Sequence, residues 1–260
     1  MTKRLFERIP RLARARPANP RVFLSAAVMG IAWIFATAMP CRADFIAYYQ
    51  TPPRAVNPGS GKPVNAAATF STSGTTLTIT LTNLETDPKA VNQNISGLLF
   101  TLTTGETTGE LTSSTADFIT VNSDHTFTAA GSGSTGWLLR TGFRGGLKLD
   151  LLGSRAGPEH TIIGPPDTDG KYDAANGSIA GKRPHNPFID QTATFLLNVT
   201  ISGDTKINEV VFSFGTECGG IVGGAAVGGD PSTPAPEPGS LLLLGTGLGA
   251  MGLAVWRKRK

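Results

Sequence analysis

The sequence predicts an all-β protein whose fold is an antiparallel β-sandwich, with a signal peptide before it and a transmembrane helix after it. Residues 75–82 alternate threonine with leucine or isoleucine, the pattern of a strand that is buried on one face only. No segment in the middle of the chain keeps a helical period over twelve residues, and glycine and proline interrupt it throughout. A β-barrel is the alternative architecture, because barrels are built from similar short strands.

Seven further segments carry the β-branched and aromatic residues that are typical of strands. In residues 207–215, Val210, Phe212 and Phe214 alternate with smaller side chains, which gives that strand one aromatic face. The seven segments are residues 67–72, 95–103, 117–121, 136–140, 147–152, 192–202 and 207–215.

The N-terminus has the three parts of a secretory signal peptide. Residues 1–21 hold seven Lys and Arg, residues 22–39 contain no charge, and small residues then occupy the first and third positions before Asp44. We expect a signal peptide over residues 1–43, export by the general secretory machinery, and cleavage by signal peptidase between Ala43 and Asp44. An uncleaved anchor helix is the alternative, because the apolar run is just long enough to span a bilayer.

The middle of the chain is acidic, although the whole chain has a formal charge of +4. Residues 44–236 carry 11 Lys and Arg against 17 Asp and Glu, a net charge of −6. A nucleic-acid-binding surface needs cations to neutralise phosphates. The charge distribution therefore excludes nucleic acid as a partner of the predicted ectodomain, residues 44–218.

The C-terminus combines a linker, a tripeptide, an apolar segment and a basic end. Residues 219–235 are rich in glycine and proline, and we expect a linker there without helix or strand. An apolar segment followed by a basic cluster is typical of a transmembrane helix with a cytoplasmic stop. The order is Pro236, Glu237 and Pro238, then the uncharged residues 239–256, then Arg257, Lys258, Arg259 and Lys260.

Residues 236–260 resemble the PEP-CTERM sorting domain of exported bacterial proteins, with the tripeptide, the apolar run and the basic end in the same order. The resemblance implies that exosortase, a membrane protease-transpeptidase, cleaves near the Pro-Glu-Pro tripeptide while the precursor is inserted in the inner membrane. It also implies a Gram-negative cell that makes extracellular polysaccharide, and a final location at the cell envelope, the outer surface or the extracellular matrix. An ordinary tail anchor is the alternative.

A long polar segment, residues 153–190, contains the one candidate metal site. Asp167, Asp169 and Asp173 flank Gly170, and alternating aspartates before a glycine can supply oxygen ligands to calcium. The further Asp or Asn and the distant Glu of an EF-hand loop are missing. The alternative is a solvent-exposed Asp-Gly turn in which the carboxylates accept backbone hydrogen bonds. We expect no other cofactor.

Trp137 is the candidate ligand-binding residue. Together with Phe143 and Arg140 it has the composition of a sugar platform, since aromatic faces stack on carbohydrate. The alternative is that Trp137 belongs to the core beside a turn.

The chain has no nucleophile elbow, no Walker loop and no dinucleotide fingerprint, and we therefore expect no enzyme. The expected role is structural or binding and associated with exopolysaccharide. A carbohydrate-binding module that uses Trp137 is one alternative. A secreted polysaccharide hydrolase is another, because the paired carboxylates of glycosidases carry no local signature and residues 153–190 supply several.

Overall fold

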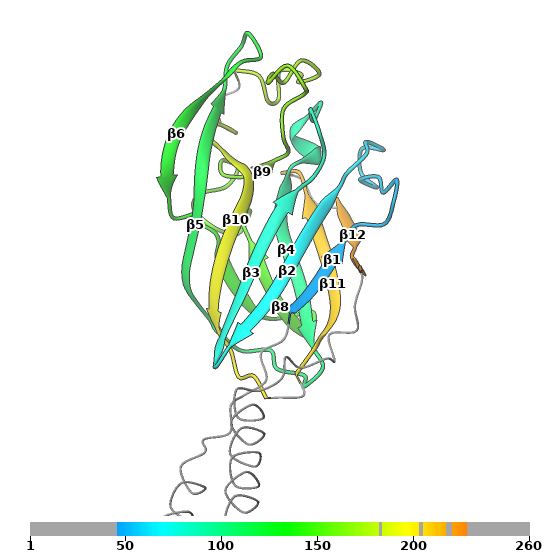
Figure 1. Cartoon of the computed structure of the whole chain (residues 1–260), viewed down its shortest axis with the longest axis vertical. Coiled ribbons are helices and arrows are strands. Elements are labelled where there is room, and N and C mark those ends of the chain that lie inside the picture. The colour runs from blue at the N-terminus through cyan, green and yellow to red at the C-terminus, as the bar shows by residue number, and fades with distance from the viewer. Residues whose placement is uncertain (1–45, 182–183, 203–204, 217–219, 228–260) are drawn as a thin grey trace, which may run out of the picture. The chain divides into compact units, whose positions relative to one another are not determined.

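The computed structural model describes residues 46–181, 184–202, 205–216 and 220–227, which form a β domain (Figure 1). These described residues contain thirteen strands, one short 3-10 turn and no α-helix, so the predicted all-β class is confirmed. The strands are β1 Ile46–Gln50, β2 Ala66–Ser73, β3 Thr76–Asn83, β4 Ile95–Leu102, β5 Glu110–Val121, β6 Phe127–Gly133, β7 Leu138–Phe143, β8 Gly146–Asp150, β9 Ile162–Ile163, β10 Phe188–Asn198, β11 Ile207–Phe214, β12 Ile221–Gly223 and β13 Ala225–Ala226; the turn, η1, is Val91–Gln93.

The strands form one connected sheet that folds into two facing layers (Figure 1). The first layer runs in the order β6, β5, β10, β3, β2, β1 and β13, and the second in the order β7, β8, β4, β11 and β12. The short strand β9 links the layers, because Ile162 pairs with Ile189 of β10 on one side and with Ile95 of β4 on the other.

Two expectations about the sheet need correction. The pairing of β9 with β10 is parallel, so the sheet is mixed and not purely antiparallel. Residues 164–187 provide the long return connection that a parallel pair requires. The path of the sheet runs from β12 to β13 without closing, so the alternative of a closed barrel is wrong.

The hydrophobic core lies between the two layers. Strand β3 buries its leucines and its isoleucine and turns its threonines outward, as the alternation predicts. Phe70 of β2 meets Phe100 of β4 edge-on, with ring centroids 5.4 Å apart. Tyr49 of β1 also reaches across, and its hydroxyl donates a 2.8 Å hydrogen bond to the carbonyl of Ile207 at the start of β11. Burial of an aromatic ring of this size stabilises a fold by about 1.5–3 kcal/mol, so these contacts fix the layers face to face.

The polar segment over residues 153–190 has an apolar centre of its own, because part of it packs as a second lobe. Tyr172 is fully buried in a cluster that also contains Val121 and Phe188. Its hydroxyl donates a 2.9 Å hydrogen bond to the carbonyl of Gly164, and burial raises the pKa of the Tyr172 phenol well above its usual value. The lobe therefore has its own apolar centre, around a tyrosine that the sequence pattern does not single out.

All eight predicted strand segments overlap with observed strands, but β1, β6, β9, β12 and β13 were not predicted. Strand β6 is exposed over its whole length and consists largely of alanine, glycine and serine, so it shows no apolar alternation. Strands β9 and β13 have two residues each, which is too short for any period to appear.

The predicted linker over residues 219–235 also needs correction at its start. Ile221–Gly223 pairs with β11, and Ala225–Ala226 pairs with β1. This glycine-rich segment therefore runs along the edges of both layers and belongs to the folded domain up to Val227, whose amide bonds to the Tyr48 carbonyl at 3.0 Å.

Candidate functional site

A groove on the outer face of the second layer is the candidate functional site. It has a volume of about 420 Å³ and is lined by residues of β4, β7, β8, β11 and β12. Its charged residues are three cations, Arg140, Arg144 and Lys148, and one acid, Asp150. Residues 44–236 hold only 11 Lys and Arg against 17 acids, so a cluster of three cations is unusual here. The groove is a positively charged surface on an acidic domain.

The strand register gives this groove an apolar floor. Leu99 of β4 lies opposite Lys148 of β8 and Val211 of β11, and Lys148 lies opposite Arg140 of β7. Alternate residues of a strand point to the same face, so these four side chains form one row on the outside of the sheet. Leu99 is only 8% exposed although it points away from the core, because its neighbours in the row flank it. The row combines two cations with aliphatic surface.

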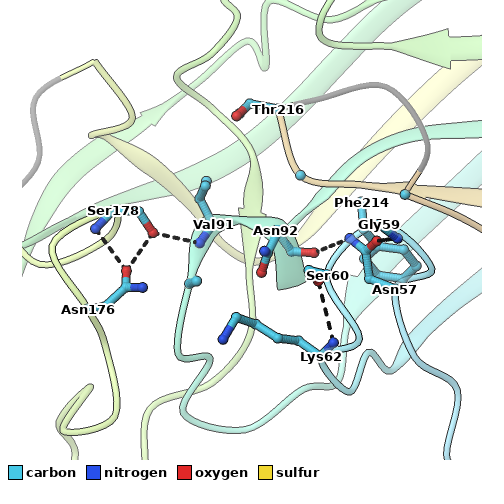
Figure 2. Close-up of a pocket in the computed structure, with 13 residues that line it drawn as sticks. Asn57, Gly59, Ser60, Lys62, Val91, Asn92, Asn176, Ser178, Phe214 and Thr216 are labelled. Carbon is cyan, nitrogen blue, oxygen red and sulfur yellow. Dashed lines mark hydrogen bonds between the residues drawn. The ribbon is translucent and has the colours of Figure 1, made fainter.

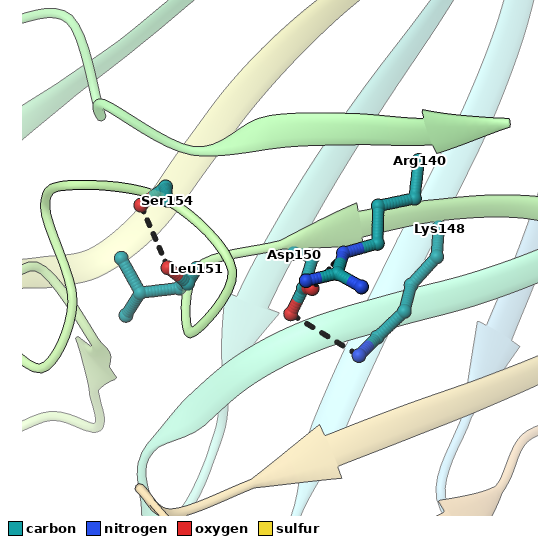
Figure 3. Close-up of polar contacts among 5 residues, drawn as sticks. All are labelled: Arg140, Lys148, Asp150, Leu151 and Ser154. Carbon is teal, nitrogen blue, oxygen red and sulfur yellow. Dashed lines mark hydrogen bonds and ion pairs between the residues drawn. The ribbon is translucent and has the colours of Figure 1, made fainter.

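Asp150 holds two of the cations in place (Figure 3). Its Oδ2 lies 2.5 Å from Arg140 Nε, and its Oδ1 lies 3.1 Å from Lys148 Nζ. The Asp150 side chain is 5% exposed, whereas that of Arg140 is 45% exposed. A buried carboxylate requires charged or hydrogen-bonding partners. Asp150 therefore orients both cations while the Arg140 guanidinium remains accessible.

Phe143 forms an aromatic wall at the end of β7. Its ring centroid lies 5.1 Å from Lys148 Nζ and 5.7 Å from Arg144 Cζ, distances at which a cation is attracted to the ring face. Leu152 and Ile221, which are 41% and 44% exposed, also line the groove. The groove thus offers cations, an aromatic ring and exposed aliphatic side chains to one ligand.

A second cleft, of about 300 Å³, lies beyond the end of β11 and is mostly polar (Figure 2). Asn57 Nδ2 donates a 2.7 Å hydrogen bond to the Asn92 carbonyl, and Ser178 Oγ accepts one of 3.1 Å from the amide of Val91. The Asn92 Oδ1 atom is buried and has no hydrogen-bond partner among the described residues. These side chains mainly tie loops together, so the cleft has fewer free groups than the cationic groove.

In the structure, Trp137 lies apart from Phe143 and Arg140, the other two residues of the predicted sugar platform. Trp137 is 5% exposed and packs in the core against Phe195, with ring centroids 5.3 Å apart, and its Nε1 donates a 3.0 Å hydrogen bond to the His160 carbonyl. It therefore presents no face to a ligand, and its placement matches the alternative of a core residue. Phe143 and Arg140, the other two members of the set, do line the groove.

Asp167, Asp169 and Asp173 form a turn. The Asp167 Oδ1 atom accepts hydrogen bonds of 2.9 Å from the amides of Asp169 and Lys171, which is the geometry of the Asp-Gly turn alternative. Across the parts of the chain that the structure describes, no group of three His, Cys, Asp or Glu side chains is placed to hold a metal ion.

Asp87 anchors the same turn region from another loop. Both of its carboxylate oxygens accept hydrogen bonds from the Ala174 amide, at 3.0 and 3.1 Å. Burial is the main cause that raises the pKa of Asp87, and the charges of Asp167 and Asp173 raise it further, whereas the Ala174 amide and His125 lower it. Asp87 thus serves to position the loop.

The residues of the two predicted processing sites lie outside the described residues. These are Ala43 and Asp44 at the signal peptide, and Pro236, Glu237 and Pro238 with the apolar residues 239–256 and the basic end, residues 257–260. In the described ranges, no helix is both long and apolar enough to cross a membrane.

The comparison with protein families concerns this C-terminal segment. Residues 234–260 match the family model of the PEP-CTERM protein-sorting motif. The chain carries a PEP-CTERM motif. The match confirms the predicted motif. A PEP-CTERM motif marks an exported protein that is made as a membrane-anchored precursor and processed by exosortase. No curated protein and no solved structure matches the chain.

Three charged residues of the groove, Arg144, Lys148 and Asp150, were not predicted as site residues from the sequence. One signal for them was present, because residues 140–148 hold three of the 11 Lys and Arg in an otherwise acidic segment. What the sequence does not contain is the pairing of β7, β8 and β4, which brings these cations over Leu99.

Proposed function

We propose that this chain is an exported, exosortase-processed protein of a Gram-negative cell envelope or extracellular matrix, whose β-sandwich ectodomain binds exopolysaccharide and performs no catalysis. The observation that carries the proposal is the PEP-CTERM match at residues 234–260. Together with the signal-peptide pattern before Asp44, it gives the chain an exit route at one end and a processing signal at the other.

In the proposed route, the general secretory machinery exports the chain and signal peptidase cleaves it between Ala43 and Asp44. The apolar residues 239–256 then hold the precursor in the inner membrane, with the basic end on the cytoplasmic side. Exosortase cleaves near Pro236-Glu237-Pro238. The domain that leaves the membrane extends to Val227, so residues 228–235 separate its last described residue from the tripeptide.

The proposed binding role is supported by the groove over β4, β7, β8 and β11. Aromatic and aliphatic side chains beside fixed polar groups are typical of ligand-binding sites. Binding is proposed in preference to hydrolysis because the groove contains a single carboxylate, Asp150, which is 5% exposed and paired with two cations. A hydrolase would need two such groups facing a common substrate cleft.

The processing part of the proposal is tested by replacing Pro236, Glu237 and Pro238 with alanine in a host that has exosortase. Two prolines hold Glu237 in an extended form that a protease cleft can accept. We expect the variant to accumulate as an uncleaved, membrane-retained precursor on an immunoblot, while the wild-type chain is shortened. Equal processing of both chains would contradict the proposal.

A further inference from the structure

We infer that the groove over β4, β7, β8 and β11 binds carboxylate-bearing sugar residues, as in a polyuronate, and this inference rests on the proposed polysaccharide-binding function. The juxtaposition that carries it is that of Lys148, Arg140 and Arg144 around the ring of Phe143, above the aliphatic Leu99.

The charge of the groove selects an anion. Asp150 neutralises one of the two cations that it contacts, and Arg144 adds another, so the groove retains an excess of two positive charges. The surrounding ectodomain is negative, with 17 acids against 11 cations over residues 44–236. An anionic polymer is therefore attracted to this surface and repelled elsewhere.

The shape and composition of the groove favour a sugar ring over an inorganic anion. Phe143, Leu152 and Ile221 supply apolar surface beside the cations. A pyranose ring has an apolar face that packs on an aromatic ring while its carboxylate points to the side. A volume of about 420 Å³ falls within the usual range for ligand sites, roughly 300–1,000 Å³. Ser213, which is partly exposed, also lines the groove, and its side chain matches a ligand rich in hydroxyl groups.

The backbone of the floor argues against an extended peptide as the ligand. Peptides that bind to sheets add a strand at an unpaired edge, where free amides and carbonyls are available. Here the floor strand β4 is paired on both sides, with β8 and β11, so the ligand contacts side chains and not a free strand edge. Recognition by side chains suits a carbohydrate with spaced carboxylates.

The test uses the full-length chain in detergent, and measures binding of polygalacturonate, neutral dextran and oligoglutamate by affinity electrophoresis and calorimetry. The site variant is Lys148→Ala with Arg144→Ala. The control variant is Lys89→Ala with Lys171→Ala, which removes the same charge at two exposed positions outside the groove. Circular dichroism checks that both variants keep the fold.

We expect polygalacturonate to bind, the site variant to weaken that binding by about 10-fold or more, and the control variant to change it little, because charged hydrogen bonds contribute most of the recognition. Added salt should weaken binding of the wild-type chain. Equal binding by the site variant would overturn the inference. Equal binding of dextran would also overturn it but leave the proposed polysaccharide-binding function standing. Stronger binding of oligoglutamate would assign the groove to acidic peptides and overturn the inference. No binding of either polysaccharide would refute both the inference and the binding part of the proposed function, but not its processing part.

Discussion

Replacing Asp150 with asparagine tests whether this carboxylate organises the groove. The change keeps the size of the side chain but removes the charge that Arg140 Nε and Lys148 Nζ approach at 2.5 and 3.1 Å. A charge-assisted hydrogen bond contributes about 1.5–3 kcal/mol, whereas an exposed ion pair contributes about 0–1 kcal/mol. The Arg140 side chain is 45% exposed and that of Lys148 is 18% exposed, so both cations regain water when the charge is lost. We therefore expect the free energy of unfolding to fall by about 1–3 kcal/mol in total.

The measurement is urea unfolding of an ectodomain fragment, residues 44–230, followed by far-UV circular dichroism at pH 7. Asp169→Asn is the matched control, because Asp169 is exposed in the turn of the polar segment and its loss should change stability little. The measurement is repeated in 1 M NaCl, which screens charges and should reduce the difference in the free energy of unfolding between the wild type and the Asp150 variant. An Asp150→Asn protein as stable as the wild type at low salt would refute the reasoning that Asp150 clamps the cations.

Two further predictions concern residues outside the groove. Trp137→Phe should lower the free energy of unfolding by about 1–3 kcal/mol, because the His160 carbonyl loses its donor. Under conditions in which the variant is folded, its affinity for polygalacturonate should equal that of the wild type. Loss of binding in a folded variant would show that Trp137 belongs to the ligand site. The Asp87→Asn variant should become more stable relative to the wild type as pH rises from 3 to 6. Burial raises the pKa of Asp87 above its usual value of 3.8, so the wild-type carboxyl favours folding most when it is protonated. The wild type loses this contribution as pH rises from 3.8 through the raised pKa of the folded state. Urea unfolding at several pH values measures the free energy of unfolding of the variant minus that of the wild type. If this difference decreases as pH rises from 3 to 6, the predicted direction is wrong.

The strands that the sequence predicts are those whose two faces meet different environments. Residues 75–82 alternate because β3 is buried against the core on one side and faces solvent on the other, and the same holds for Val210, Phe212 and Phe214 of β11. Strand β6 could not be predicted in this way, because it is exposed on both faces and its pairing with β5 is specified by the partner strand. The glycine-rich β12 and β13 are strands because they lie along the edges of β11 and β1, and composition alone predicts a linker.

The candidate site was predictable only in part. Phe143 and Arg140 follow from aromatic and basic composition near a turn, and both line the groove. Trp137 lies only three positions before Arg140 in the sequence, which suggested a common site, yet its side chain points into the core while Arg140 faces outward. The role of Asp150 depends on the register between β7 and β8, a long-range property that local sequence does not encode.

The PEP-CTERM account is tested most directly by determining both ends of the mature protein in a host with exosortase and in the same host without it. Intact-mass and terminal-peptide mass spectrometry of the protein from each host measures them. The account predicts a chain that starts at Asp44 in both hosts, ends near Pro236-Glu237-Pro238 when exosortase is present, and retains Lys260 when it is absent. A mature chain that ends at Lys260 in both hosts would contradict it.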